Sequence, residues 1–192
     1  MTPSDADGWT PMERVEGIRW KPLLLTLAIA LVVAIGLNWS ILELFGQRSA
    51  DRAEHSLIGI ILLSVYVSRF IRRQESRLGA VTFLLLALIP CYLGTVFPDL
   101  DITFFGIGAH RNPLFHSSVS FLILWALVAR QHVILQTLIL GYGIGLASHL
   151  WWDVIDYGNV RWLPGGTIDR LWLAVNGLIC LLPLLMRSGR GP

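Results

Sequence analysis

Seven side chains of the types that bind metal ions lie beside hydrophobic segments of this chain: His55, Asp99, Asp101, His110, His116, His149 and Asp153. Imidazoles and carboxylates are costly near hydrocarbon unless they are paired, hydrated or bound to a cation. Their grouping at the ends of apolar segments therefore indicates a functional site. We predict a metal site embedded in a membrane.

The spacing of two pairs would let their side chains meet one cation. His149 and Asp153 are four residues apart, so on a helix they lie on one face, about 6 Å apart along its axis. Asp99 and Asp101 follow Pro98, which should end the preceding helix. In an extended segment alternate side chains share a face, so we expect both acids to point to one centre. A solvated turn is the alternative.

The segment between these pairs carries two more histidines and an arginine. Asn112 is a good helix N-cap and Pro113 suits the first helical position, so we expect a helix to begin there with His116 in its opening turn. Free amides at a helix start attract anions, and Arg111 can hold a phosphate-like substrate group with two hydrogen bonds. Snorkelling of Arg111 to the membrane interface is the alternative.

The ligand types favour zinc, with manganese or iron as alternatives, over calcium. Four histidines and three aspartates exceed the needs of one tetrahedral ion, so two ions, or one ion with proton-moving groups, both remain open. His55 alone would more often be an ordinary interface histidine. We assign metal binding to Asp99, Asp101, His149, Asp153, His116 and His55, proton transfer to His110 and His116, and supporting or loop roles to Asp156, Asp169 and Arg170.

Composition predicts the class of protein that holds these residues. The chain has 192 residues, is 54% hydrophobic and has a mean hydropathy of +0.62, with its charges confined to short intervals between apolar segments. This pattern is typical of an all-α membrane protein and not of a soluble domain or a disordered tail. A net charge of +2 is too small to imply nucleic-acid binding. Cys91 and Cys180 lie inside apolar segments, so we expect no disulfide.

The elements that must position the seven residues are helices, since backbone polar groups in lipid have to be satisfied within one segment. We predict a bundle of about six transmembrane helices over residues 23–45, 56–67, 79–97, 114–129, 133–155 and 171–186. Residues 22–46 would form an additional anchor helix and 50–187 the domain with the site. Residues 1–21 would form a short interfacial helix, or else a partly ordered tail.

Orientation follows from the basic residues. A cytoplasmic N-terminus places ten Lys and Arg on the cytoplasmic side against five on the other, which favours cytoplasmic termini at both ends of the chain. All seven candidate ligands then fall on the non-cytoplasmic side. We therefore expect a multi-pass protein of a bacterial-type cytoplasmic membrane.

Four motifs in order, each at the end of an apolar segment, resemble those of the YdjM-like family of membrane-bound, metal-dependent hydrolases. They are Ala53-Glu54-His55, Phe97-Pro98-Asp99-Leu100-Asp101, His110-Arg111 with His116-Ser117, and Gly145-Leu146-Ala147-Ser148-His149-Leu150-Trp151-Trp152-Asp153. The resemblance covers roughly residues 50 to 185. It implies a hydrolase in which these His and Asp side chains are metal ligands or catalytic groups, and it names no substrate.

Three positions depart from the pattern of that family. Ile102 stands where a polar residue, commonly histidine, follows the second acid; Phe115 stands where threonine is usual; and Asp156 stands in a segment that is usually Thr-Pro-x-Gly. These changes could retune specificity, or could mark a chain that has kept the fold and lost turnover.

The function expected from these features is hydrolysis of a lipid or lipid-linked ester, first of all a phosphoester, at the non-cytoplasmic side of the membrane. Arg111 and Ser117 would bind the substrate, with the phosphate on Arg111. One alternative is an intramembrane zinc amidase acting on a sphingolipid-like substrate. Another is a catalytically silent accessory subunit that contacts other membrane protein subunits. A transporter is disfavoured because the chain has no repeated halves.

Overall fold

The computed structural model describes residues 24, 28, 32, 50–74, 77–130, 132–156 and 158–188. Every regular element in these ranges is helical, which confirms the all-α prediction. The predicted interfacial segment, residues 1–21, lies outside the described residues. So does the predicted anchor helix, residues 22–46, apart from three helical positions: Leu24, Ala28 and Val32.

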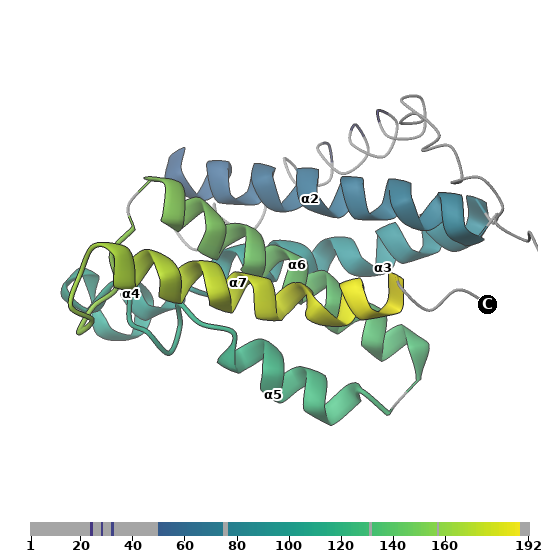
Figure 1. Ribbon diagram of the computed structural model, residues 1–192. Coiled ribbons are helices and arrows are strands. Elements are labelled where there is room, and N and C mark those ends of the chain that lie inside the picture. The colour runs from purple at the N-terminus through teal and green to yellow at the C-terminus, as the bar shows by residue number, and fades with distance from the viewer. Residues whose placement is uncertain are drawn as a thin grey trace, which may run out of the picture.

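One helix lies at the centre of the described bundle. The elements are α2 (Ala50–Gln74), α3 (Arg77–Val96), α4 (Leu100–Phe105), the 3-10 helix η1 (Ile107–Ala109), α5 (Val119–Val128), α6 (Val133–Asp156) and α7 (Thr167–Ser188). Helix α6 packs against α2, α3, α5 and α7. Figure 1 shows that the start of α2, the end of α6 and the start of α7 lie at the same end of the bundle as α4.

Glycines on α6 allow its close approach to α3. A Cβ atom on Gly141 would collide with the backbone of Ala87, and one on Gly145 would collide with the carbonyl group of Cys91. These two glycines are four residues apart and so lie on one face of α6. Small residues with this spacing let membrane helices pack backbone against backbone. The close α3–α6 contact holds the ends of both helices, and the site residues there, in a fixed relation.

Apolar side chains fill the bundle and also cover its outside. Two buried clusters form the core, one centred on Leu63, Ala87 and Ile144 and the other on Phe121, Leu150 and Leu173. Outward-facing stripes run along three helices, with residues spaced mainly four apart: Leu57, Ile61 and Val65 on α2, Val81, Leu85 and Ile89 on α3, and Leu171, Val175, Leu178 and Leu182 on α7. Helices that are apolar on all faces are typical of a lipid environment.

Two of the described helices are long and apolar enough to cross a membrane. They are Val133–Asp156 and Thr167–Leu184. Shorter apolar helices cover His55–Ser68, Val81–Val96 and Val119–Val128. The sequence predicts spans at residues 133–155 and 171–186, and these ranges agree closely with the two helices.

The prediction that a helix begins at Asn112-Pro113 is wrong, because α5 begins only at Val119. The Asn112 side chain does accept a hydrogen bond from the Leu114 amide (2.9 Å), as a cap should. However, the single turn that follows ends at His116. The Ser118 amide then donates to Asn176 Oδ1 on α7 (2.9 Å) in place of a carbonyl one turn earlier. A tertiary hydrogen bond therefore interrupts the helix.

Candidate metal centre

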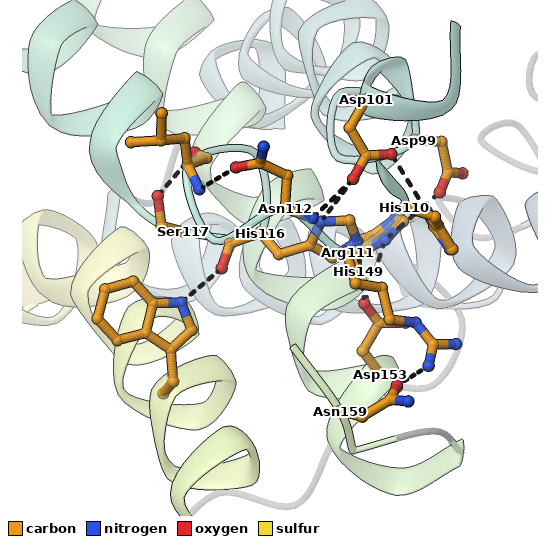
Figure 2. Close-up of polar contacts among 12 residues, drawn as sticks. Asp99, Asp101, His110, Arg111, Asn112, His116, Ser117, His149, Asp153 and Asn159 are labelled. Carbon is orange, nitrogen blue, oxygen red and sulfur yellow. Dashed lines mark hydrogen bonds and ion pairs between the residues drawn. The ribbon is translucent and has the colours of Figure 1, made fainter. Parts of the chain in front are cut away.

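The structure brings all seven predicted residues together at one end of the bundle. His55 comes from α2, Asp99 and Asp101 from the beginning of α4, and His149 and Asp153 from the last turns of α6. His110 and His116 come from the loop between η1 and α5. All of them are buried except His110, whose side chain is 23% exposed. Figure 2 shows six of these side chains, with Asp99, Asp101, His110 and His116 above the end of α6.

Asp153 lies among three histidines from separate segments. Its Oδ2 atom is 3.5 Å from Nε2 of His149 and 3.5 Å from Nε2 of His116, and its Oδ1 atom is 3.9 Å from Nε2 of His55. The rings of His55 and His149 are stacked, with centroids 3.8 Å apart. The side chains of His149 and Asp153 thus meet on one helix face, as their spacing predicts. The other two histidines lie next to the same carboxylate.

Asp101 forms the second half of the centre. Its Oδ1 atom accepts a hydrogen bond from His110 Nδ1 (3.1 Å), and its Oδ2 atom accepts one from the Asn112 amide (2.9 Å). His116 Nδ1 lies 3.5 Å from the same Oδ2 atom. The ring of His116 therefore lies between the carboxylates of Asp101 and Asp153 and connects the two halves.

The two acids after Pro98 do not lie in an extended segment, which corrects that prediction. Asp99 has helical backbone angles (φ −71°, ψ −7°), and the Asp101 and Ile102 amides bond to the carbonyls of Pro98 and Asp99. A tight helical turn is possible because Pro98 lies at its beginning, where it has no amide to satisfy. Asp99 and Asp101 consequently approach the centre from different sides. Asp99 Oδ1 is 4.0 Å from His149 Nε2, while Asp101 contacts His110 and His116.

The orientation of His149 is set by a backbone group of α3. Its Nδ1 atom donates a hydrogen bond to the carbonyl oxygen of Thr95, 2.7 Å away. The proton of a neutral ring is then on Nδ1, and Nε2 turns its lone pair toward Asp99 and Asp153. Metal-binding histidines are usually held in this way, by a carbonyl group on the nitrogen that does not bind the ion.

The protonation states of the loop groups suit a cation. Burial lowers the pKa of His116 to about 3, with the neighbouring His149 acting in the same direction, so its ring is neutral at pH 7. Burial by itself would raise the pKa of Asp101, but hydrogen bonds from His110 and the Asn112 amide bring it below the ordinary value. Neutral imidazole beside ionised carboxylate is the combination that binds divalent metals.

The shortest distances within the centre are close to those expected around a metal. Two groups of three residues have ligand atoms that all lie within 4.8 Å of one another: His55, His149 and Asp153, and Asp99, His110 and His116. Two ligand atoms on one tetrahedral zinc ion, each about 2.1 Å from it, are about 3.4 Å apart. The 3.5 Å separations around Asp153 are close to this value.

Unsatisfied polar atoms support the same interpretation. Both ring nitrogens of His116 and Oδ2 of Asp153 are buried and have no hydrogen-bond partner among the described residues. Leaving such atoms without a partner costs about 1–3 kcal/mol each. Three buried carboxylates also bring negative charge into the interior of the bundle. A divalent cation would give a partner to Asp153 Oδ2 and to the one ring nitrogen of His116 that carries a lone pair, and it would balance negative charge, so these residues fit a metal.

The two predicted substrate-binding residues each make a hydrogen bond within the protein. Arg111 has a left-handed backbone (φ 64°), and its Nη1 atom donates to Asn159 Oδ1 in the loop after α6. The Ser117 hydroxyl donates to the Leu114 carbonyl (2.8 Å) within its own turn. Since no long helix begins at Pro113, the expected anion site at a helix start is missing there. Ser117 thus shapes the turn that carries His116.

Sequence reasoning did not identify the residues of α7 that hold the His116 turn. Asn176 Oδ1 accepts hydrogen bonds from the amide (2.9 Å) and hydroxyl (2.8 Å) of Ser118. Trp172 Nε1 donates to the His116 carbonyl (3.0 Å). The available signal was Asn176 itself, a polar side chain in an apolar helix. Asp169, predicted as a supporting or loop residue, accepts from the Val160 and Gly165 amides and so organises the loop after α6.

Comparison with known proteins places the chain in a family. Residues 83–189, more than half of the chain, match the family model described as Domain of unknown function (DUF5942). The chain belongs to the DUF5942 family. The DUF5942 region begins within α3 and contains six of the seven site residues, whereas His55 lies before it. No curated protein and no solved structure matches the chain.

Proposed function

We propose that this DUF5942 protein is a membrane-embedded, metal-dependent hydrolase that acts on a lipid or lipid-linked phosphoester at the non-cytoplasmic side. The observation that carries the proposal is the convergence of four histidines and three aspartates from α2, α4, α6 and the loop before α5. The motifs that resemble the YdjM-like hydrolases contain these same residues. Zinc is the expected metal, with manganese or iron as alternatives, and one or two ions would bind.

The membrane part of the proposal rests on the outer surface of the helices. Two helices are long enough to span, and apolar stripes face outward on α2, α3 and α7. We propose six spans with cytoplasmic termini in a bacterial inner membrane, the shorter helices being accommodated by local thinning of the bilayer. The metal centre then lies at the non-cytoplasmic ends of the spans.

Each residue of the centre has a distinct role in this proposal. When bound, a divalent ion would polarise a phosphoryl oxygen and lower the pKa of a water molecule toward 7. Asp153, His149, His116 and Asp99 would hold the ion, with His55 beside His149. His110 is the most exposed member and is oriented by Asp101, so it is placed to transfer a proton to or from the substrate. Arg111, held by Asn159, lies next to His110 in the chain and would bind the phosphate.

The test is metal content and hydrolysis measured on the same purified protein. Wild-type protein in detergent should contain stoichiometric zinc and release phosphate from phosphatidic acid. His149→Ala should lose both, because Nε2 of this ring faces two carboxylates of the centre. His132→Ala is the matched control, since His132 is exposed and directly precedes the first residue of α6, a full helix length away from Asp153. Hydrolysis that persisted without bound metal would refute the mechanism.

A second candidate function is a structural or accessory subunit that retains the metal site without turnover. It is favoured by the departures at Ile102, Phe115 and Asp156 and by the use of the Ser117 hydroxyl within its own turn. Asp156 is exposed and Phe115 packs against other aromatic rings. This function predicts bound zinc but no hydrolysis of phosphatidic acid or of ceramide. Ceramide cleavage alone would instead support an intramembrane amidase.

A further inference from the structure

The short helix α4 is buried at its beginning and exposed at its end. Asp101 points into the metal centre and is fully buried, whereas Phe104 and Phe105 on the same helix are 66% and 60% exposed. Ile107 in η1 and Leu114 in the following loop are also exposed, at 74% and 64%. We call these four residues the apolar rim: Phe104, Phe105, Ile107 and Leu114. The rim lies beside the metal centre, at the end of the bundle where α4 is found (Figure 1).

Aromatic side chains pack against the inner side of the rim. Phe115 contacts the rings of Phe104 and Phe105, with centroids 6.2 and 6.0 Å apart. Phe115 in turn stacks on Phe97 at the end of α3, with centroids 5.5 Å apart. The exposed rings are therefore held in place by the same segment that carries His116. Phe115, a departure from the YdjM-like pattern, has a structural role here.

The position of the rim along the bundle corresponds to a membrane interface. Helix α6 is long enough to span and ends at Asp156, next to the metal centre. In the loop that follows, the Arg161 guanidinium lies over the exposed Trp162 ring, 5.4 Å from its centroid. The Arg161 amide bonds to the Arg111 carbonyl (2.9 Å), which joins this loop to the segment after η1. Tryptophan is enriched at the headgroup level, where arginine can bind lipid phosphate.

We propose that the apolar rim inserts into the acyl-chain region of the non-cytoplasmic leaflet and binds the chains of a phospholipid whose phosphoester faces the metal centre. This inference rests on the proposed function and narrows its substrate to lipids carrying long acyl chains that approach from within the bilayer. Exposed apolar side chains gain free energy by entering hydrocarbon. The guanidinium groups of Arg111 and Arg161 complement the anionic headgroup of such a lipid. The rim thereby distinguishes a lipid from a soluble phosphoester.

Membrane insertion can be tested without any assay of hydrolysis. Phe104→Cys and Ile107→Cys are each labelled with an environment-sensitive fluorophore in the full chain, in which Cys91 and Cys180 are buried, and reconstituted in phosphatidylcholine vesicles. Lipids with a nitroxide on the acyl chain should quench both labels more strongly than aqueous iodide. Asp156→Cys, exposed at the same end of the bundle, is the control and should show the reverse. Stronger quenching by iodide at Phe104 and Ile107 would overturn the proposal, as would protection from both quenchers, which would indicate a covering segment or a second copy.

Substrate selection is tested with a rim variant. Phe104→Ser combined with Phe105→Ser should lower cleavage of phosphatidic acid in vesicles by about tenfold or more. Cleavage of the soluble probe p-nitrophenyl phosphate and zinc content should stay within about twofold, because both side chains are exposed and pack on Phe115 rather than on a residue of the metal centre. Equal loss of both activities with zinc retained, or no loss of either, would overturn the inference. If wild-type protein cleaves neither probe, the proposed function fails, and the quenching result still decides whether the rim enters the bilayer.

Discussion

His149 and Thr95 are joined by a hydrogen bond from the imidazole Nδ1 to the backbone carbonyl of α3, 2.7 Å long. This contact links the two most closely packed helices directly to the metal centre. Because the carbonyl accepts the Nδ1 proton, the Nε2 atom is left to face Asp99 and Asp153. Placement of this candidate ligand is therefore part of the α3–α6 packing.

The substitution His149→Asn separates the two functions of that ring. The asparagine amide can keep the hydrogen bond to Thr95, but it has no atom in place of Nε2. We expect the fold to be retained, with a melting temperature in detergent close to that of wild type, and zinc affinity to fall by about 100-fold or more. His132→Asn should change neither quantity. A variant that bound zinc as tightly as wild type would show that Nε2 is not a ligand.

A comparison of two Asp101 variants separates charge from hydrogen bonding. Asp101→Ala leaves the Asn112 amide and His110 without their acceptor, so the free energy of unfolding should fall by about 1–3 kcal/mol. Asp101→Asn keeps an oxygen for the amide and should destabilise the protein less. Both should weaken zinc binding, because both remove the negative charge. Thermal melts with and without a chelator measure these effects, and equal destabilisation by the two variants would contradict this assignment.

Asn176 acts on the centre only through the turn that carries His116. In Asn176→Leu the Ser118 amide and hydroxyl lose their acceptor, so we expect zinc affinity to fall by about tenfold and stability by about 1–3 kcal/mol. Asn176→Asp retains the acceptor and should rescue most of the zinc affinity. Zinc titration of both variants makes the comparison. If the leucine variant binds zinc normally, the turn is held by other contacts.

The α3–α6 contact should not tolerate a side chain on Gly145. A Cβ atom there would collide with the carbonyl group of Cys91, so Gly145→Ala should force the helices apart and destabilise the protein by about 1–3 kcal/mol. Gly108→Ala is the matched control, since a Cβ atom at Gly108 meets nothing within 4 Å. Chemical or thermal unfolding in detergent provides the measurement. Similar stability of the two variants would mean that the backbones are not in close contact.

Much of the arrangement could be predicted from local patterns. Apolar length identified α6 and α7, and the spacing of His149 and Asp153 placed both on one helix face because helical periodicity is a local property. The sequence also predicts that the candidate ligands lie at the ends of spans on one side of the membrane. This prediction is consistent with their meeting at one end of the bundle. Asp99 and Asp101 also reach the centre as predicted, although their backbone is helical and not extended.

The features that could not be predicted depend on distant partners. Helix α5 begins late because Ser118 bonds to Asn176, which lies 58 residues further along the chain. A cap signal at Asn112 cannot reveal that competition. Likewise, the glycines of α6 indicate close packing only when Ala87 and Cys91 are known to lie opposite. Phe115 looked like a departure from a motif, and its packing under the apolar rim is visible only in the fold.

The central claim is that a cation holds these side chains together, and zinc titration of metal-free protein tests it most directly. Isothermal calorimetry on wild type and Asp153→Ala should show one or two zinc ions per wild-type chain and loss of at least one site in the variant, since three histidines lie within 4 Å of this carboxylate. Absence of zinc binding by the wild type, or unchanged binding by Asp153→Ala, would contradict the account.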